Sequence, residues 1–157
     1  MAMNDSNLDL EISRLLAVPR ALVWRAWSDP VLLAQWWCPR PWKTTVRGFD
    51  MRPGGAFDTL MMGPDGEKSD NPGSFLEVVS AERVVFTTAL TAGWRPATPW
   101  LSVTGVFTMA DEGSGTRYTA RALHKDAADA RKHLQMGFNE GWGACIDQLE
   151  ALARTLS

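Results

Sequence analysis

Turn-forming residues recur at near-even intervals through the middle of the chain, and this spacing constrains the fold more than any other feature. The turns fall at 53–55, 64–66, 71–73, 80–82, 93–99 and 112–115. Between them lie runs rich in β-branched and aromatic residues, a pattern typical of antiparallel hairpins. An alternating apolar run near the N-terminus adds a further strand. About seven strands are predicted, at 7–17, 43–51, 56–62, 74–79, 83–91, 100–109 and 116–124.

Two short helical patterns follow the first strand. Pro19 stands where a first helical turn tolerates proline, and apolar residues recur at helical spacing within 22–27. Asp29 and Pro30 then repeat the signal as an N-cap followed by proline at the first helical position. The sequence therefore predicts two short helices, the second ending near Trp37.

The last part of the chain has a different pattern. Residues 126–156 contain no proline, and their apolar side chains recur along one helical face. This face comprises Leu134, Phe138, Trp142, Cys145, Leu149 and Leu152. A helix of about 30 residues would span about 45 Å, enough to cross strands about 30 Å long. We therefore expect one long C-terminal helix packed against a curved antiparallel sheet.

Three glycines interrupt this expected helix. Gly137 and Gly141 lie at the edge of the apolar face, where a missing side chain leaves room for strand backbone or for a bound ligand. Gly143 points the opposite way, and the sequence gives no reason for it.

Length and charge exclude several classes of protein. The 157 residues fit one domain, 1–157. Net charge is -2 and no block of Lys or Arg stands out, which argues against nucleic acid and anionic membrane as partners. No apolar run reaches the length of a membrane span, and the first residues lack a signal-peptide pattern. A cytoplasmic location is expected; a homodimer through exposed Trp or an edge strand stays open.

No specific catalytic, metal or cofactor motif is present in the sequence, so neither metal nor cofactor is expected. Glu77 stands two residues after Phe75 and would share its face. A carboxylate buried there would have a raised pKa and could transfer protons, whereas the alternative is a structural hydrogen bond or an ion pair with a neighbouring Arg. His124, at the end of the last strand, is either a general base or a structural residue. His133 falls outside the apolar face of the final helix.

Eight Trp against one Tyr is the unusual composition. These side chains either fill the core or line a cavity, as aromatic residues do in small-molecule sites. Strand alternation and the helical face place many of the aromatic and apolar residues toward one interior. The expected ligand-binding residues are Trp36, Trp37, Trp42, Phe57, Met61, Phe75, Phe86, Trp100, Phe107, Leu134, Phe138 and Trp142. The pattern predicts an aromatic-lined cavity for an apolar small molecule.

Short motifs in a fixed order carry a family resemblance. They include Val18-Pro19, Asp29-Pro30, Trp36-Trp37, Arg52-Pro53-Gly54-Gly55, Gly73-Ser74-Phe75-Leu76-Glu77, Thr104-Gly105-Val106-Phe107 and Gly141-Trp142. From about residue 10 to 153 the chain resembles the START-like (SRPBCC) superfamily. Within it, the chain is similar to bacterial homologues of the activator of the heat-shock protein 90 ATPase.

The resemblance implies an α+β helix-grip fold of the START/Bet v type. Family members bind hydrophobic or polyketide-like ligands, stimulate a chaperone, or have no assigned role. Three functions follow: binding of an apolar molecule, a cavity enzyme of cyclase, hydrolase or isomerase type using Glu77 or His124, and a co-chaperone module in the stress response. The eukaryotic co-chaperones carry a second, N-terminal domain without a counterpart here, which argues against the third. Gly105 replaces a usually bulkier residue and is expected to enlarge the cavity.

Overall fold

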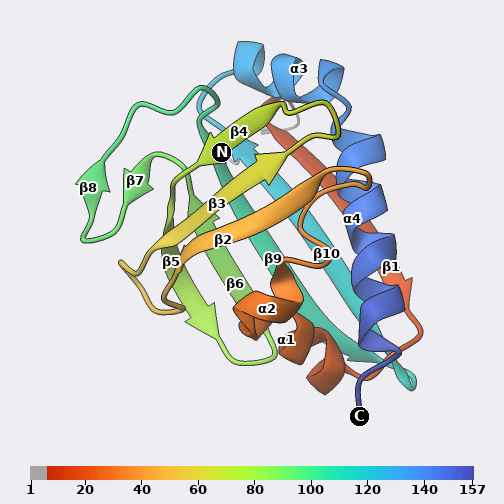
Figure 1. The fold of residues 1–157 in the computed structure, drawn as a ribbon. Helices are drawn as coiled ribbons and strands as arrows, with labels where there is room; N and C mark the ends of the chain where they lie inside the picture. The colour runs from red at the N-terminus through yellow and green to blue at the C-terminus, as the bar shows by residue number, and fades with distance from the viewer. Residues whose placement is uncertain (1–6) are drawn as a thin grey trace.

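The computed structural model describes residues 7–157, which form ten strands and four helices (Figure 1). One strand and two helices come first, nine strands follow, and two helices end the chain. The first six residues, to which the expectation about a signal peptide applies, lie outside this range. The strands are β1 (Asp9–Leu16), β2 (Lys43–Phe49), β3 (Phe57–Met62), β4 (Lys68–Asn71), β5 (Ser74–Val79), β6 (Arg83–Thr87), β7 (Leu90–Thr91), β8 (Arg95–Pro96), β9 (Val103–Glu112) and β10 (Gly115–His124). The helices are α1 (Arg20–Ser28), α2 (Pro30–Leu33), α3 (Ala127–Gln135) and α4 (Phe138–Ala153).

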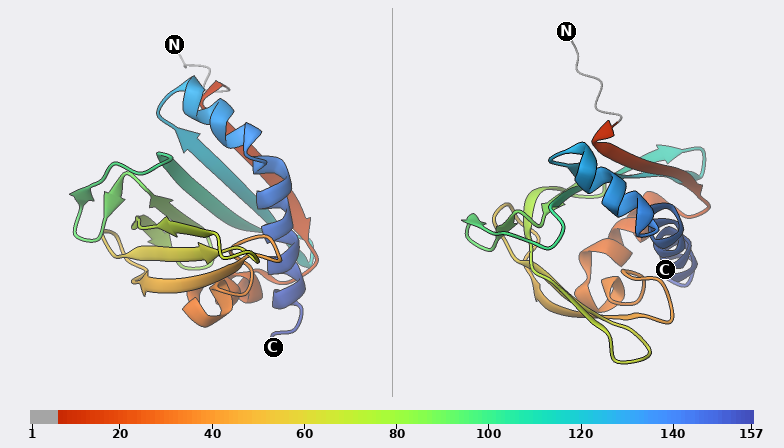
Figure 2. Two further views of the ribbon diagram at one scale, coloured as in Figure 1. Left: turned by 45° about the horizontal axis from the view of Figure 1, so that its top comes forward. Right: turned by 90° about the horizontal axis from the view of Figure 1, so that it is seen from above.

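The strands form a curved antiparallel surface around the helices. Five strands pair in the order β1-β10-β9-β6-β5, three in the order β2-β3-β4, and β7 pairs with β8. A bridge between Ala56 and Ser74 joins the first two sheets at one corner, where Phe57 N also donates to Gly73 O at 3.0 Å. Figure 2 shows the two sheets bending around an interior that α4 flanks along its length. The α+β fold with a curved antiparallel sheet is confirmed.

The strand count is about ten, and not about seven, because three short strands carry little sequence signal. β4 reads Lys-Ser-Asp-Asn and contains no β-branched or aromatic residue. It pairs only with β3, and polar residues are common on such sheet edges. β7 and β8 have two residues each, and β8 includes a proline. The seven predicted strands are all present, with ends shifted by a few residues.

The first two helices begin where the sequence predicts. Pro19 is the N-cap of α1, and the Asp29 carboxylate accepts a hydrogen bond from Val31 N at 2.9 Å at the start of α2. α2 ends at Leu33, earlier than expected, and turns follow it as far as Trp37. Within residues 7–157 no helix is both long and apolar enough to reach across a membrane.

The expected single C-terminal helix is two helices. Gly137 lies between α3 and α4 with φ 95°, a left-handed conformation that ends α3 and starts α4 in a new direction. The same region explains Gly143. A Cβ at that position would lie 2.9 Å from an Nη of Arg14, so the glycine lets the Arg14 side chain pass along α4. Arg14 reaches Asp147 with an ion pair of 2.6 Å.

The solid part of the core surrounds Trp27 of α1. Trp27 is 0% exposed, and its ring lies 5.0–6.1 Å from four other aromatic rings. Its indole Nε1 donates to the Tyr118 hydroxyl at 2.9 Å, so the buried N–H has a partner. A cavity begins beside this packed core, whose Trp36, Phe57 and Tyr118 line it, and reaches α3 at His133.

Candidate functional site: an aromatic cavity with a histidine pair

A cavity of about 640 Å³ lies between the curved sheet, the segment 36–42 and the two C-terminal helices. Small-molecule sites usually have volumes of about 300–1,000 Å³. Ten of the twelve residues expected from the sequence line this cavity. They are Trp36, Trp37, Trp42, Phe57, Met61, Phe86, Trp100, Phe107, Phe138 and Trp142.

Two expected residues do not line the cavity. Phe75 is fully buried behind the wall, packed against Phe57 at a ring distance of 4.8 Å. Leu134 is 45% exposed and points outward. Leu134 shares a face with Phe138 only if the helix is unbroken. The change of direction at Gly137 turns α3, so that other residues of α3 face the interior.

The inner wall is a continuous set of aromatic rings. Trp37 lies 5.1 Å from Phe57 and 5.8 Å from Phe86, both edge-on. Phe107 of β9 lies 5.9 Å from Trp37 and stacks on Trp142 of α4 at 5.6 Å, which extends the set to the helix. Such rings offer both faces and edges to a bound molecule, so the wall suits a flat apolar ligand.

Gly105 lies behind two rings of the cavity wall and does not line the cavity itself. A Cβ at this position would lie 2.5 Å from Phe86 and 2.9 Å from Phe107, whose rings stack at 6.0 Å. The missing side chain gives room to these two rings, and Gly105 is not among the lining residues.

Trp100 stands at the mouth of the cavity and connects two of its walls. Its Nε1 donates to Asn71 Oδ1 of β4 at 3.0 Å, and its carbonyl accepts from Lys132 Nζ of α3 at 2.9 Å. The Lys132 ammonium also lies over the indole, 5.6 Å from its centroid. Although it is held on both sides, Trp100 is 52% exposed.

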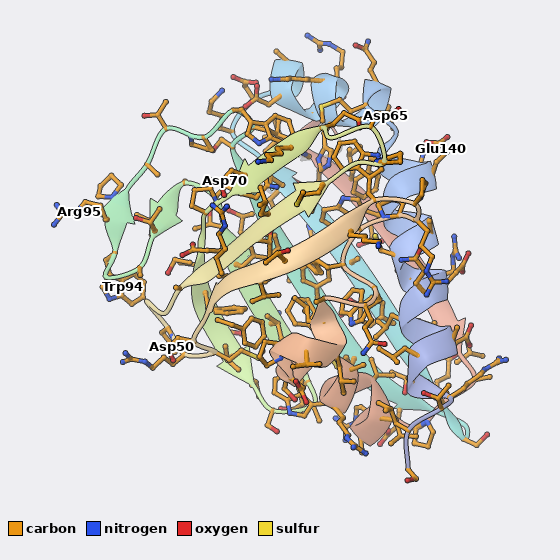
Figure 3. The ribbon with its side chains drawn as sticks, viewed as in Figure 1. Asp50, Asp65, Asp70, Trp94, Arg95 and Glu140 are labelled. Atoms are coloured by element: carbon orange, nitrogen blue, oxygen red, sulfur yellow. The ribbon has the colours of Figure 1, made fainter. Side chains whose placement is uncertain are left out.

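Trp94, in contrast, lies far from the cavity. It is an exposed residue of the β7–β8 hairpin, whose outer position beside Arg95 is visible in Figure 3. Its indole covers Gly54, where a Cβ would come within 2.7 Å of the ring. The eight Trp therefore divide between core, cavity wall and surface.

Both cysteines line the cavity as protonated thiols. Burial raises the pKa of the Cys145 thiol to about 12. Burial also raises the pKa of Cys38, whose sulfur accepts a hydrogen bond from Thr44 Oγ1 at 3.0 Å. Because the thiolate is the nucleophilic form, neither cysteine is prepared for covalent chemistry.

Glu77 does not face the cavity. The pairing of β5 with β6 has a bulge between Phe75 and Glu77, which breaks the alternation that would have placed both side chains on one face. The Glu77 side chain is 50% exposed and forms an ion pair with Arg83 at 2.6 Å. The ion-pair alternative describes this residue, and the condition for a catalytic carboxylate is not met.

His124 is buried and forms a pair with His133, a residue that the sequence pattern missed. His124 Nδ1 lies 2.7 Å from Leu8 O, and its Nε2 lies 2.9 Å from Nδ1 of His133. His133 is 8% exposed and lines the cavity, whereas His124 lies behind it. Burial and, second, the neighbouring His124 lower the pKa of His133 to about 4, so its ring is neutral at pH 7. The sequence signal for His133 is Gly137, because glycine often ends a helix. A helix that ends there no longer has to turn the same face inward as the helix that follows.

The histidine pair is not part of a larger ligand cluster. Among residues 7–157 there is no group of three or more His, Cys, Asp or Glu side chains placed to hold a metal ion. The cavity therefore combines an apolar aromatic wall, two protonated thiols and one imidazole at its α3 end. A few other polar residues also line it: Arg40, Thr59, Ser69, Asn71 and Thr88.

Comparisons with known proteins agree with this architecture. A solved protein from Nitrosomonas europaea is 46% identical, with 97% of each chain covered and a TM-score of 0.91. One from Mycobacterium smegmatis is 30% identical, covers 96% of this chain and 93% of its own, and has a TM-score of 0.80. One from Arthrobacter aurescens, at 22% identity, covers 99% of this chain and 91% of its own with a TM-score of 0.84, and shares the fold.

No curated protein gives a match. The family model described as "Activator of Hsp90 ATPase homolog 1-like protein" matches residues 17–154, nearly the whole helix-grip structure. The chain therefore belongs to this family.

Proposed function

We propose that this protein binds and sequesters an apolar, aromatic small molecule in the cavity between the curved sheet and α4. The observation that carries the proposal is the 640 Å³ cavity with its aromatic wall. Protein interiors are close-packed and contain few voids larger than a water molecule. A cavity of this size beside the tightly packed core around Trp27 therefore indicates a binding site for a small molecule.

The expected affinity is moderate. A ligand that buries about 400 Å² of apolar surface gains about 10 kcal/mol at about 25 cal/mol per Å². Association itself costs at least about 4 kcal/mol. The remainder of about 6 kcal/mol corresponds to a Kd of tens of micromolar. Tighter binding would require polar contacts in addition to the aromatic wall.

The test uses the fluorescent probe 8-anilinonaphthalene-1-sulfonate and two substitutions at Gly141. A Cβ at Gly141 would lie 3.8 Å from Pro39, another lining residue, so a long side chain there enters the cavity. Gly141→Leu should weaken probe binding about tenfold or more. The matched control, Gly141→Ala, should bind as the unmodified protein does. Equal affinity in all three proteins, with unchanged circular dichroism, would contradict the proposal.

Native mass spectrometry identifies the ligand class directly. Protein purified from its own host without denaturation should carry a retained small molecule, and Gly141→Leu purified in the same way should carry less of it. An equal amount of retained molecule in both proteins would place it outside the cavity.

A chaperone interaction is the competing proposal, and the family description supports it. It predicts that the protein is retained by immobilised heat-shock protein 90 and stimulates its ATPase. Gly141→Leu distinguishes the two proposals, because an interaction through the outer surface should stimulate the ATPase equally well when the cavity is filled. Loss of stimulation in this variant would connect the two activities.

A further inference from the structure

Resting on the proposed ligand-binding function, we infer that the cavity selects apolar molecules carrying a hydroxyl group, and that Nε2 of His133 accepts the hydrogen bond from this hydroxyl. The ligand class is thus a neutral phenol or alcohol with an aromatic or similarly apolar body. The site consists of His133, the His124 ring behind it, and the rings of Phe138 and Trp142 beside it.

The direction of the hydrogen bonds follows from one fixed acceptor. The Leu8 carbonyl can only accept, so His124 Nδ1, at 2.7 Å, carries the proton and donates. His124 is 7% exposed and forms no ion pair with a carboxylate among residues 7–157, so a second proton would leave a buried charge uncompensated. Its other nitrogen therefore has a free lone pair and accepts from Nδ1 of His133 at 2.9 Å. A neutral His133 that donates from Nδ1 has a bare Nε2. The pair therefore presents an acceptor, and not a donor, at its free end.

This free nitrogen opens toward the cavity. No residue between 7 and 157 forms a hydrogen bond with His133 Nε2, yet no buried side-chain nitrogen or oxygen in this range lacks a partner. Nε2 consequently keeps some accessible surface, and the cavity is the space that His133 lines. The rings of Phe138 and Trp142 hold the imidazole edge-on, with centroids at 5.2 Å and 5.6 Å.

An unpaired acceptor in an apolar site discriminates between ligands. A purely apolar ligand that covers Nε2 removes its contact with water and offers no hydrogen bond to replace it, which costs binding free energy. A ligand with a hydroxyl at the same place restores the hydrogen bond. Sites with buried polar groups therefore reject analogues that lack the matching group more strongly than apolar pockets reject a change of size. A carboxylate placed at this nitrogen would meet a lone pair and not a donor, so it gains no hydrogen bond there.

The experiment compares 2-naphthol with 2-methoxynaphthalene, in which a methyl group replaces the hydroxyl proton. Both have the same aromatic body, so the apolar contribution is nearly equal. In isothermal titration at pH 7.5 the protein should bind 2-naphthol about ten to a hundred times more tightly. His133→Phe keeps a ring of similar shape without nitrogen, and should bind both probes with the same affinity. His133→Gln, which can still offer an acceptor, should recover part of the preference.

A measurement on the unmodified protein keeps the test valid even if the variants do not fold. Nitrogen-15 NMR should find His133 Nε2 unprotonated at pH 7.5, with a shift that changes on addition of 2-naphthol but much less with 2-methoxynaphthalene. A protonated Nε2, or equal affinity for both probes in the unmodified protein, would overturn this inference while leaving ligand binding intact. If neither naphthalene probe nor the anilinonaphthalene probe binds, the proposed function fails and this inference with it.

Discussion

Alanine at Gly137 and at Gly141 is the same chemical change at two positions four residues apart, and the structure predicts opposite effects on stability. Gly137 is the residue between α3 and α4 and has φ 95°. Gly141 is inside α4, where its backbone is helical. In neither case does a new Cβ meet an obstacle: the nearest atoms would be Glu140 Oε2 at 3.5 Å and Pro39 Cγ at 3.8 Å. The difference is therefore a backbone effect.

Its size can be estimated for each position. A left-handed conformation costs a residue with a Cβ about 1–2 kcal/mol, so Gly137→Ala should destabilise the protein by this amount. In a helix interior, alanine is about 0.8–1 kcal/mol more favourable than glycine, so Gly141→Ala should stabilise it. The two variants should thus differ by about 2–3 kcal/mol in free energy of unfolding.

Urea unfolding followed by tryptophan fluorescence measures this difference. The midpoints should move in opposite directions with an unchanged slope, since neither variant alters the surface exposed on unfolding. For a chain of this length, about 1 kcal/mol corresponds to about 2–4 °C in Tm, so calorimetry can repeat the test. If Gly137→Ala stabilised the protein as much as Gly141→Ala, the C-terminal segment would be one continuous helix and the reasoning would be refuted.

Three further predictions concern the core, the mouth and the histidine pair. Tyr118→Phe removes the acceptor of the buried Trp27 N–H and should lower the free energy of unfolding by about 1–3 kcal/mol; an unchanged urea midpoint would contradict this. Trp100→Ala removes the link to Asn71 and should speed release of the anilinonaphthalene probe in stopped-flow experiments; an equal release rate would argue against a role at the mouth. The pKa of His133 is lowered from 6.5 to about 4, so the unfolded chain takes up a proton first as pH falls. This contribution to stability is full above pH 6.5 and should be lost between pH 6.5 and 4. Its upper limit is about 3 kcal/mol, and about half of that is expected because the ring faces solvent in the cavity. His133→Phe should lose less stability over this range, and parallel pH curves for the two proteins would refute the assignment.

Much of the fold could be predicted because its signals are local. The Asp29-Pro30 cap and the strand alternation depend on neighbouring residues, and the structure has both where the sequence indicates them. β4 escaped prediction because an edge strand needs only a partner, β3, and no apolar face of its own. The cavity wall followed from alternation as well, since inward-facing aromatic residues on adjacent strands meet at one interior.

Two errors at the site, at Glu77 and in the C-terminal segment, have a common physical cause, which is a backbone irregularity that periodicity cannot detect. A bulge in β5 turned Glu77 to the surface, although simple alternation put it beside Phe75. In the C-terminal segment, the apolar pattern continues through Gly137 and predicts Leu134 inside and His133 outside. The structure has the reverse, with Leu134 exposed and His133 buried. Each error arises at a single residue where the backbone leaves regular geometry, and each moves a polar side chain relative to the cavity.

The left-handed Gly137 therefore connects the fold to the proposed selectivity. In a continuous helix Leu134 would share a face with Phe138 and Trp142, and the α3 end of the cavity would be apolar throughout. The break replaces Leu134 by His133 at this end and provides the acceptor for a hydroxyl. Gly137→Ala, which favours a continuous helix, should thus reduce the preference for 2-naphthol over 2-methoxynaphthalene in isothermal titration. It should do so with little change in affinity for the methoxy probe, because the aromatic wall of Phe57, Phe86 and Phe107 belongs to the sheet. An undiminished preference in a folded Gly137→Ala protein would separate the selectivity from the helix break.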